Sequence, residues 1–309
     1  MSVPGEFSLI ARHFRALAGD GALELTDDAA VFAPPPGREI AVAADAMVEG
    51  VHFLPDDPPD TVGRKLLRVN LSDMAAMGAV PFAYLMTLSL PRAEEAWLAG
   101  FCAGLASDQR QYGVRLLGGD TTSTHGPAVL SLTVLGSVAP GAAVVRGGAR
   151  PGDALWVTGT IGDGALGLAV RTGRLSLPEP HAGFLVDRYR LPQPRLLPIA
   201  GFARAAMDVS DGLVQDLGHI CRASGCGAEV EAASVPASDA ARAAGEDWLV
   251  ARLTGGDDYE LLLALPPDVT PPFAATRIGR FVAGVPEVVV RDAAGAPILL
   301  SQGGWSHFA

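Results

Sequence analysis

Short apolar segments alternate with longer stretches of helical periodicity along almost the whole chain. This alternation is typical of an α/β or α+β fold, in which helices cover the faces of mixed sheets. The opening stretch, residues 7–17, repeats apolar residues every three or four positions and predicts an amphipathic helix. The apolar segments predict strands over 29–33, 40–44, 83–90, 114–117, 128–138, 153–158, 205–209, 261–265 and 288–290. Further helices are predicted over 92–112, from the glycine-rich turn 159–164, after the proline-rich segment 191–198 and from Gly212.

A cluster of glycine and proline between Pro140 and Gly152 predicts a boundary between two domains. We expect an N-terminal domain over residues 1–138 and a C-terminal domain over residues 150–309. Hydrophobic residues make up 49% of the chain and charged residues 18%, so each domain can bury a sizeable core.

The charge balance excludes several classes of protein. The formal net charge is -11, whereas a nucleic-acid binder needs a basic face for phosphate contacts. The chain has 22 arginines but a single lysine, Lys65, which follows no glycine-rich loop of the P-loop type. The sequence has neither an uncharged apolar run of about 18 residues nor the pattern of a signal peptide. We therefore expect a cytoplasmic enzyme that contacts neither nucleic acid nor membrane and uses no P-loop.

The three cysteines indicate no special chemistry. Cys102, Cys221 and Cys226 form neither a C-x-x-C pair nor a zinc-type group with histidines, so we interpret them as buried thiols. Since Cys/His and Ser/His/Asp constellations are also lacking, the sequence offers no dedicated nucleophile.

Aspartates recur at the ends of the apolar segments, where α/β folds place their ligands. The set comprises Asp27, Asp28, Asp45, Asp73, Asp120, Asp208, Asp211, Asp257 and Asp258. Each one alone is more simply a helix cap or a turn residue. Together, and with Gly118-Gly119 and Gly255-Gly256 before two of them, they favour a site where cations offset the repulsion between carboxylates. Magnesium prefers oxygen ligands and bridges to phosphates, so the pattern favours phosphoryl transfer from a nucleotide.

Six longer motifs, in this order, resemble the thiamine-monophosphate kinase family. They are residues 5–10, 48–53, 70–79, 118–122, 208–213 and 255–261. The resemblance extends from Gly5 to about Trp305, nearly the whole chain. It implies ATP-dependent phosphorylation of thiamine monophosphate to thiamine diphosphate with Mg²⁺, by direct in-line transfer. It also implies the two-domain fold of aminoimidazole ribonucleotide synthetase and a homodimer formed through the N-terminal strands.

The resemblance assigns roles to single residues. The matching metal ligands are Asp28, Asp45, Asp73, Asp120, Asp208 and Asp211. The positions near ATP are Tyr112, Gly119, Asp120, Arg146 and Ser210, and those near thiamine monophosphate are His52, Asp257 and Trp305. Arg146 can pair with a phosphate in fork geometry, and Trp305 can stack on the cationic thiazolium ring. Asp257 can meet positive charge or accept a hydrogen bond from an amino group.

The chain departs from the family pattern at a few positions. Ala43 and Ala44 stand where hydroxyl residues are usual, so the metal site beside Asp45 lacks a side-chain oxygen ligand. Asp257 stands where relatives commonly have glutamate, and Thr26 replaces a usual glycine. None of these changes removes the core set of carboxylates.

Other activities remain as alternatives. Selenophosphate synthetase normally has a reactive Cys or selenocysteine near its N-terminus, whereas the first cysteine here is Cys102. The hydrogenase-maturation relative ends with a cysteine, and aminoimidazole ribonucleotide synthetase lacks the 49–53 signature. A non-catalytic regulator that binds nucleotide or Mg²⁺ is disfavoured by the full set of aspartates. An ATP-turnover assay with thiamine monophosphate separates these readings.

Overall fold

The computed structural model describes residues 5–307, which form two compact units. The N-terminal unit comprises residues 5–74 and 79–141. The C-terminal unit comprises residues 142–307 together with the short segment 75–78. Within residues 5–307, none of the helices combines the length and the apolar character that a membrane crossing requires.

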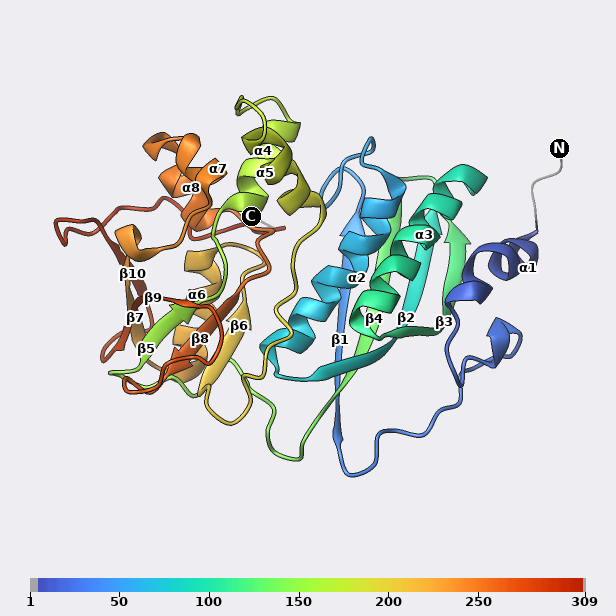
Figure 1. Ribbon diagram of the computed structural model, residues 1–309, viewed down its shortest axis with the longest axis horizontal. Helices are drawn as coiled ribbons and strands as arrows, with labels where there is room; N and C mark the ends of the chain where they lie inside the picture. Colours follow the sequence, from blue (N-terminus) through green and yellow to red (C-terminus); the bar gives the residue numbers. More distant parts are fainter. Residues whose placement is uncertain (1–4, 308–309) are drawn as a thin grey trace. The chain divides into compact units, whose positions relative to one another are not determined.

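The N-terminal unit is built on a four-stranded mixed sheet whose strand order is β1-β4-β2-β3. Its strands are β1 (Glu39–Val48), β2 (Val80–Leu90), β3 (Arg115–Ser123) and β4 (Val129–Val138). Strand β4 pairs antiparallel with β1 and with β2, whereas β2 and β3 are parallel and are connected through α3 (Glu95–Tyr112). Helices α2 (Pro59–Ala76) and α3 lie side by side along one face of this sheet (Figure 1).

Burial alternates along β2, as expected for a sheet covered on one face. Met86 and Leu88 are buried, whereas Leu85 and Thr87, which alternate with them, are exposed. The sheet register carries this alternation to the neighbouring strands, because residues directly opposite each other share a face. One face therefore packs under the helices, and the other carries exposed side chains.

Helices α2 and α3 approach each other closely and share a buried ionic pair. A Cβ atom at Gly104 would lie 2.0 Å from the carbonyl oxygen of Asp60, so only glycine permits this spacing. Asp108 is fully buried and accepts hydrogen bonds from Arg68 Nε at 2.6 Å and from Arg64 Nε at 3.0 Å. Removing one partner of such a pair leaves an uncompensated charge, so the pair fixes the two helices relative to each other.

The first described residues form a short helical segment against β3. It runs through the α-helix α1 (Glu6–Leu9), the π-helical turn η1 (Ile10–Phe14) and the 3₁₀ turns η2 (Arg15–Leu17) and η3 (Leu23–Leu25). Gly19 donates its N–H to the Leu116 carbonyl of β3 at 2.9 Å, which attaches the segment to the edge of the sheet. The helix predicted over 7–17 is thus confirmed, although its turns are of three kinds.

The C-terminal unit contains a six-stranded sheet with the strand order β10-β7-β9-β5-β8-β6. Its strands are β5 (Ala154–Val157), β6 (Ala205–Asp208), β7 (Gly227–Glu231), β8 (Leu261–Leu265), β9 (Thr276–Val282) and β10 (Val288–Arg291). Its helices are α4 (Asp163–Arg171), α5 (His181–Arg190), α6 (Leu213–Ser224), α7 (Asp239–Ala243) and α8 (Leu249–Thr254), with the 3₁₀ turns η4 (Ala232–Ser234) and η5 (Glu246–Trp248). Only β10 and β7 run parallel, and every other neighbouring pair is antiparallel.

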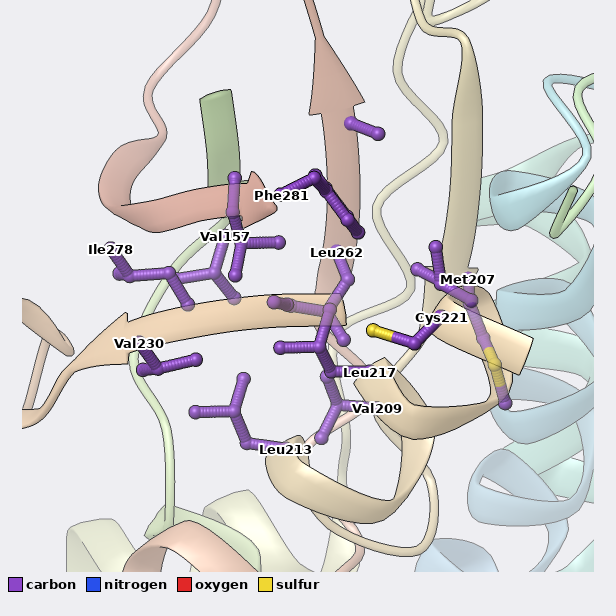
Figure 2. Packing of buried hydrophobic residues seen from close by; sticks show 14 of the residues in the cluster. Val157, Met207, Val209, Leu213, Leu217, Cys221, Val230, Leu262, Ile278 and Phe281 are labelled. Carbon is purple, nitrogen blue, oxygen red and sulfur yellow. The ribbon is translucent and has the colours of Figure 1, made fainter. Parts of the chain in front are cut away.

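Helix α6 packs its apolar face against this sheet. Leu213, Leu217 and Cys221 recur at helical spacing and lie beside Leu262 of β8 in the buried cluster shown in Figure 2. Burial of these side chains anchors the helix, so the turn that precedes α6 has a fixed position over the end of β6.

Most predicted elements are confirmed, and two are wrong. Residues 29–33 form no strand, because Pro34, Pro35 and Pro36 follow and provide no N–H groups to extend a ladder. The proline-rich segment 191–198 leads into an irregular stretch rather than into a helix. The sequence pattern did not predict α2, α5, α7, α8, β7 or β9.

Candidate functional site

A cavity of about 300 Å³ lies in the N-terminal unit, between its first described residues and β3. Asp28 and Asp120, two of the predicted metal ligands, both line it, together with Asp27. Apolar residues such as Phe14 and Leu116 form other parts of the wall. We refer to Asp28 and Asp120 as the cavity aspartates. Carboxylates beside a partly apolar hollow suit a ligand that has both an anionic, cation-bound part and a ring.

Gly119 precedes Asp120 in β3 and is required by the sheet itself. A Cβ atom at this position would lie 1.7 Å from the carbonyl oxygen of Met86 on the neighbouring strand. The adjacent strand therefore already occupies the space that a side chain at Gly119 would need. This contact fixes the backbone that presents Asp120 to the cavity.

A strained turn precedes Asp27 and Asp28. Leu23, Glu24 and Leu25 have φ angles of 49°, 55° and 58°, a left-handed conformation that residues other than glycine rarely adopt. Each such residue costs of order 1–3 kcal/mol and persists only where its surroundings enforce it. The turn is held by hydrogen bonds such as that from the Val31 N–H to the Gly21 carbonyl, at 2.8 Å.

Asp45 and Asp73 lie at another part of the N-terminal unit. The Asp45 N–H on β1 donates to Asn70 Oδ1 on α2 at 3.0 Å. Asp73 follows Asn70 by three positions on α2, so both project from the same side of that helix. We refer to Asp45 and Asp73 as the β1–α2 aspartates. Asp73 was expected at the end of an apolar segment, and the structure places it inside α2 instead.

The two aspartate groups are separated by the width of the sheet. Asp45 lies on one edge strand and Asp120 on the other, with β4 and β2 between them. Three strand spacings place their backbones about 14 Å apart. They also differ in face: Asp45 pairs with buried Leu132, whereas Asp120 pairs with exposed Thr87. One copy of this sheet therefore does not bring Asp45 and Asp120 to the same cation.

His52 is held by its neighbours on both sides. Its Nδ1 accepts the Val48 N–H at 2.9 Å, so in the neutral ring the proton resides on Nε2. Its carbonyl oxygen accepts a hydrogen bond from Nζ of Lys65 at 2.9 Å, and Lys65 is almost entirely buried. The chain's single lysine thus fixes the turn that carries a predicted substrate residue.

Tyr112 lies at the C-terminal end of α3 rather than in the wall of the cavity. The guanidinium of Arg68 lies over its ring, 5.7 Å from the centroid. The structure therefore gives Tyr112 a packing partner on α2, while its predicted contact with ATP stays a prediction.

In the C-terminal unit, the end of β6 and the turn between β6 and α6 bring together five of the predicted site residues. Asp208 ends β6, and Ser210 and Asp211 follow in the turn. The Ser210 carbonyl accepts the Asp257 N–H, and the Asp211 carbonyl accepts the Trp305 N–H, each at 2.9 Å. The turn thus unites residues predicted for the nucleotide and metal with residues predicted for thiamine monophosphate.

Gln215 on α6 closes this arrangement. Its Nε2 donates to Asp211 Oδ2 at 3.2 Å and to the Trp305 carbonyl at 2.5 Å. The Trp305 backbone is therefore held at both its N–H and its carbonyl, while its side chain remains 53% exposed. Asp257 has a φ of 72°, a strained conformation for a residue other than glycine.

Asp216, which was not predicted, lies beneath the same turn. Its Oδ2 accepts the N–H groups of Ser210, Asp211 and Gly212 at 3.0, 2.9 and 3.1 Å. Burial raises the pKa of Asp216 to about 8, although the N–H groups of Asp211 and Gly212 act in the opposite direction. The sequence signal was an acidic residue in the first turn of a helix, which by itself indicates only a capping role.

A buried ionic cluster supports the segment that follows Asp257. Glu260 is fully buried and accepts hydrogen bonds from Arg195 at 2.6 Å and from Arg188 at 3.0 Å. The Asp258 carboxylate accepts the N–H groups of Gly162 and Gly164, and burial raises the pKa of Asp258 to about 8. Asp258 and Glu260 belong to the 255–261 motif, but their supporting role and their arginine partners were not predicted from the sequence.

Arg146 lies near a second cationic side chain. The pKa of His219 lies below its usual range because of burial and then the positive charges of Arg222 and Arg146. Arg222 also lies 3.1 Å from the His219 ring nitrogen. Arg222 lies in the last turn of α6, and the Arg146 carbonyl accepts a hydrogen bond from Ser224 Oγ at the end of that helix, at 3.4 Å.

Among residues 5–307, no three or more His, Cys, Asp or Glu side chains are arranged to hold a metal ion by themselves. Magnesium is usually held by one or two protein carboxylates together with water and substrate phosphates. The hard carboxylate oxygens at the cavity and at the β1–α2 pair fit that mode of binding.

The chain matches two family models and known kinases over most of its length. Residues 26–138 match the family described as AIR synthase related protein, N-terminal domain, and residues 150–287 match its C-terminal domain. The thiamine-monophosphate kinase of Salmonella typhimurium is 42% identical over 326 aligned residues, which cover 99% of this chain and 98% of that protein.

Two solved structures share the fold at high coverage. The thiamine-monophosphate kinase of Stenotrophomonas maltophilia K279a is 39% identical with a TM-score of 0.83, covering 93% of this chain and 96% of that one. AaThiL in complex with AMPPCP and TMP is 31% identical with a TM-score of 0.81, covering 100% and 99%.

Proposed function

Because the chain belongs to the thiamine-monophosphate kinase family of AIR synthase related proteins, we infer that it transfers the γ-phosphoryl group of ATP to thiamine monophosphate. The products are ADP and thiamine diphosphate. The near full-length match to such kinases supports this activity, and so does the relative that binds AMPPCP and TMP. The observation that carries the proposal is the β6–α6 turn, which ties Ser210 and Asp211 to Asp257 and Trp305.

The chain's own residues bind and orient the two substrates. Arg146 pairs with ATP phosphate, Ser210 and the Gly119-Asp120 backbone lie along the nucleotide, and Tyr112 lies at its edge. His52, Asp257 and Trp305 face thiamine monophosphate. The acceptor phosphate is already anionic, so transfer requires alignment more than a strong base. We therefore propose direct in-line transfer without a covalent enzyme intermediate.

Magnesium completes the proposal, with Asp28, Asp45, Asp73, Asp120, Asp208 and Asp211 as its ligands. When bound, Mg²⁺ neutralises charge on the phosphates and on the group in transfer. The aspartates hold negative charge at fixed positions, since β1, α2, β3 and β6 carry most of them on regular elements. Beside Asp45, Ala43 and Ala44 contribute only backbone carbonyls, so water completes that site.

A homodimer explains the separation of the two aspartate groups. In a pair of copies joined through their N-terminal sheets, the cavity aspartates of one copy meet the β1–α2 aspartates of the other. Exposed apolar side chains support such pairing: Val42 and Val80 are each 61% exposed, and Leu85 is 40% exposed. The register places Val42 and Leu85 on the face that the helices leave open. Residues 1–138 would then form the domain that binds ATP and Mg²⁺ and makes the dimer contact. Residues 150–309 would form the C-terminal synthetase-like domain of a cytoplasmic enzyme.

An assay with labelled ATP tests the activity and its metal requirement. With thiamine monophosphate and Mg²⁺, label should appear in thiamine diphosphate, and excess EDTA should abolish the reaction. With ATP and Mg²⁺ alone, the denatured chain should carry no label, because no nucleophile takes part. Stoichiometric label on the chain that is released by thiamine monophosphate would contradict in-line transfer, and a wild-type enzyme inactive with thiamine monophosphate would contradict the activity.

The Trp305→Ala variant should weaken binding of thiamine monophosphate but not of ATP. Its backbone hydrogen bonds to Asp211 and Gln215 do not depend on the side chain, which is half exposed. Stacking of the indole on the thiazolium ring is worth roughly 1–3 kcal/mol, so KM for thiamine monophosphate should rise about 5- to 150-fold. Steady-state kinetics with each substrate varied in turn measure this change.

Trp305→Phe serves as the matched control, because it keeps an aromatic face and should lose less affinity. The KM for ATP and the melting temperature should stay unchanged in both variants. A lower melting temperature together with parallel increases in both KM values would show that Trp305 packs the C-terminal segment instead.

A further inference from the structure

The carboxylate of Asp216 lies inside the β6–α6 turn and contacts the backbone rather than the side chains of the predicted substrate residues. Its side chain is fully buried, and a single oxygen, Oδ2, accepts three consecutive backbone N–H groups. The second oxygen, Oδ1, is buried and has no hydrogen-bond partner. All the polar contact of this carboxylate is thus directed at the backbone of Ser210, Asp211 and Gly212.

The carbonyl groups of the same backbone segment hold other residues of the site. The carbonyls of Ser210 and Asp211 accept the N–H groups of Asp257 and Trp305. Gly256 leaves no room for adjustment, since a Cβ there would lie 2.2 Å from the Ser210 carbonyl. The orientation of these two peptide groups therefore determines where Asp257 and Trp305 lie, as well as where Ser210 and Asp211 point.

We propose that Asp216 is the positioning residue for both substrate subsites: its Oδ2 orients the turn that holds Ser210 and Asp211 on one side and Asp257 and Trp305 on the other. The assignment of these subsites rests on the proposed function. The hydrogen bonds themselves do not, and they exist without either substrate. Without this acceptor, the three N–H groups would be left without a hydrogen-bond partner, and their peptide groups would rotate to find one. The carbonyls of Ser210 and Asp211 would then change direction as well.

Two substitutions separate the role of the acceptor oxygen from mere packing. Asp216→Asn keeps one oxygen that can occupy the Oδ2 position and places its NH₂ where Oδ1 has no partner. Asp216→Leu keeps the branched arrangement of four side-chain heavy atoms but offers no acceptor. The matched control is Asp153→Leu, because Asp153 is equally buried in the same unit and accepts the Arg150 N–H. It pairs with Arg204, which precedes β6, whereas the turn follows the other end of that strand.

Hydrogen exchange read by mass spectrometry on the peptide spanning 208–214 reports the turn directly, without substrate or metal. Exchange at these amides should be slow in the wild type and in Asp216→Asn, and clearly faster in Asp216→Leu. Asp153→Leu should lower the melting temperature and leave exchange in this peptide unchanged. Unchanged protection in Asp216→Leu would overturn the proposal.

Kinetics supply the second readout. For Asp216→Leu, kcat/KM should fall about 100-fold for ATP and for thiamine monophosphate alike, whereas Asp216→Asn should stay within about tenfold of the wild type. Should Asp216→Leu fail to fold, Asp216→Ala takes its place with the same expectations. Loss of activity in Asp216→Asn as deep as in Asp216→Leu, with exchange still slow, would overturn the positioning role. If the wild type is inactive on thiamine monophosphate, the proposed function is contradicted. The hydrogen-exchange measurement then tests the role of Asp216 by itself.

Discussion

Replacing Asp120 by asparagine is expected to reduce turnover by about 10²- to 10³-fold, which corresponds to about 3–4 kcal/mol of lost transition-state stabilisation. The side chain keeps its size and loses the charge that holds a cation beside the cavity. The melting temperature should not change, because Asp120 is exposed. Initial rates over a range of Mg²⁺ concentrations measure the effect, with Asp20→Asn as the control that removes a charge from the same unit outside the cavity. Near-normal turnover of folded Asp120→Asn at limiting Mg²⁺ would contradict the metal role.

Mixing two inactive variants extends this test to the homodimer. If each site takes Asp45 from one copy and Asp120 from the other, a mixed dimer of Asp45→Asn and Asp120→Asn copies has one intact site and one doubly substituted site. Such a dimer should regain about half of the wild-type activity. If both aspartates serve a site within one copy, every site in the mixed dimer carries a substitution and the activity stays low. Co-expression with two affinity tags isolates the mixed dimer for this measurement.

The Gly119→Ala variant should be destabilised by about 3 kcal/mol or more. Its Cβ would lie 1.7 Å from the Met86 carbonyl, so β2 and β3 would have to separate. The neighbouring Gly118→Ala variant is the matched control, because there the nearest atom to a new Cβ is the Leu85 side chain at an ordinary 3.6 Å. Its stability should stay within about 1 kcal/mol of the wild type. Urea unfolding of both variants measures the difference. Equal unfolding midpoints would contradict the close contact between β2 and β3 at Gly119.

The elements that the sequence predicted correctly are those with a strong period. Strand β2 alternates buried and exposed residues, and α3 ends at Gly113, whose left-handed φ of 70° is a common helix end. Helix α2 was missed because Gly63, Asn70, Ser72 and Asp73 are poor helix formers, and tertiary packing against α3 outweighs their preference. Local helix propensity therefore did not predict this helix, which also carries residues of the candidate site.

The candidate site also has features that the sequence predicts and features that it does not. Aspartates at strand ends could be recognised one by one, since Asp45, Asp120 and Asp208 do lie on or at the end of strands. That Asp45 and Asp120 lie on opposite edges of one sheet depends on strand order, which the sequence does not reveal. The link from Ser210 to Asp257 and from Asp211 to Trp305 runs through backbone atoms, and every residue type has those atoms. Asp216 was missed for a related reason, because its partners are backbone N–H groups.

The Asp108 carboxylate under Arg64 and Arg68 has a consequence for behaviour at different ionic strengths. Asp108 is fully buried and Arg68 nearly so, and dissolved ions screen charges effectively only where water reaches them. The cavity aspartates are exposed, so added salt weakens their attraction for a cation. Concentrated salt should therefore lower catalytic activity at concentrations that leave the α2–α3 contact intact. An enzyme inhibited in this way should regain its activity on dialysis, because the two helices stay packed together.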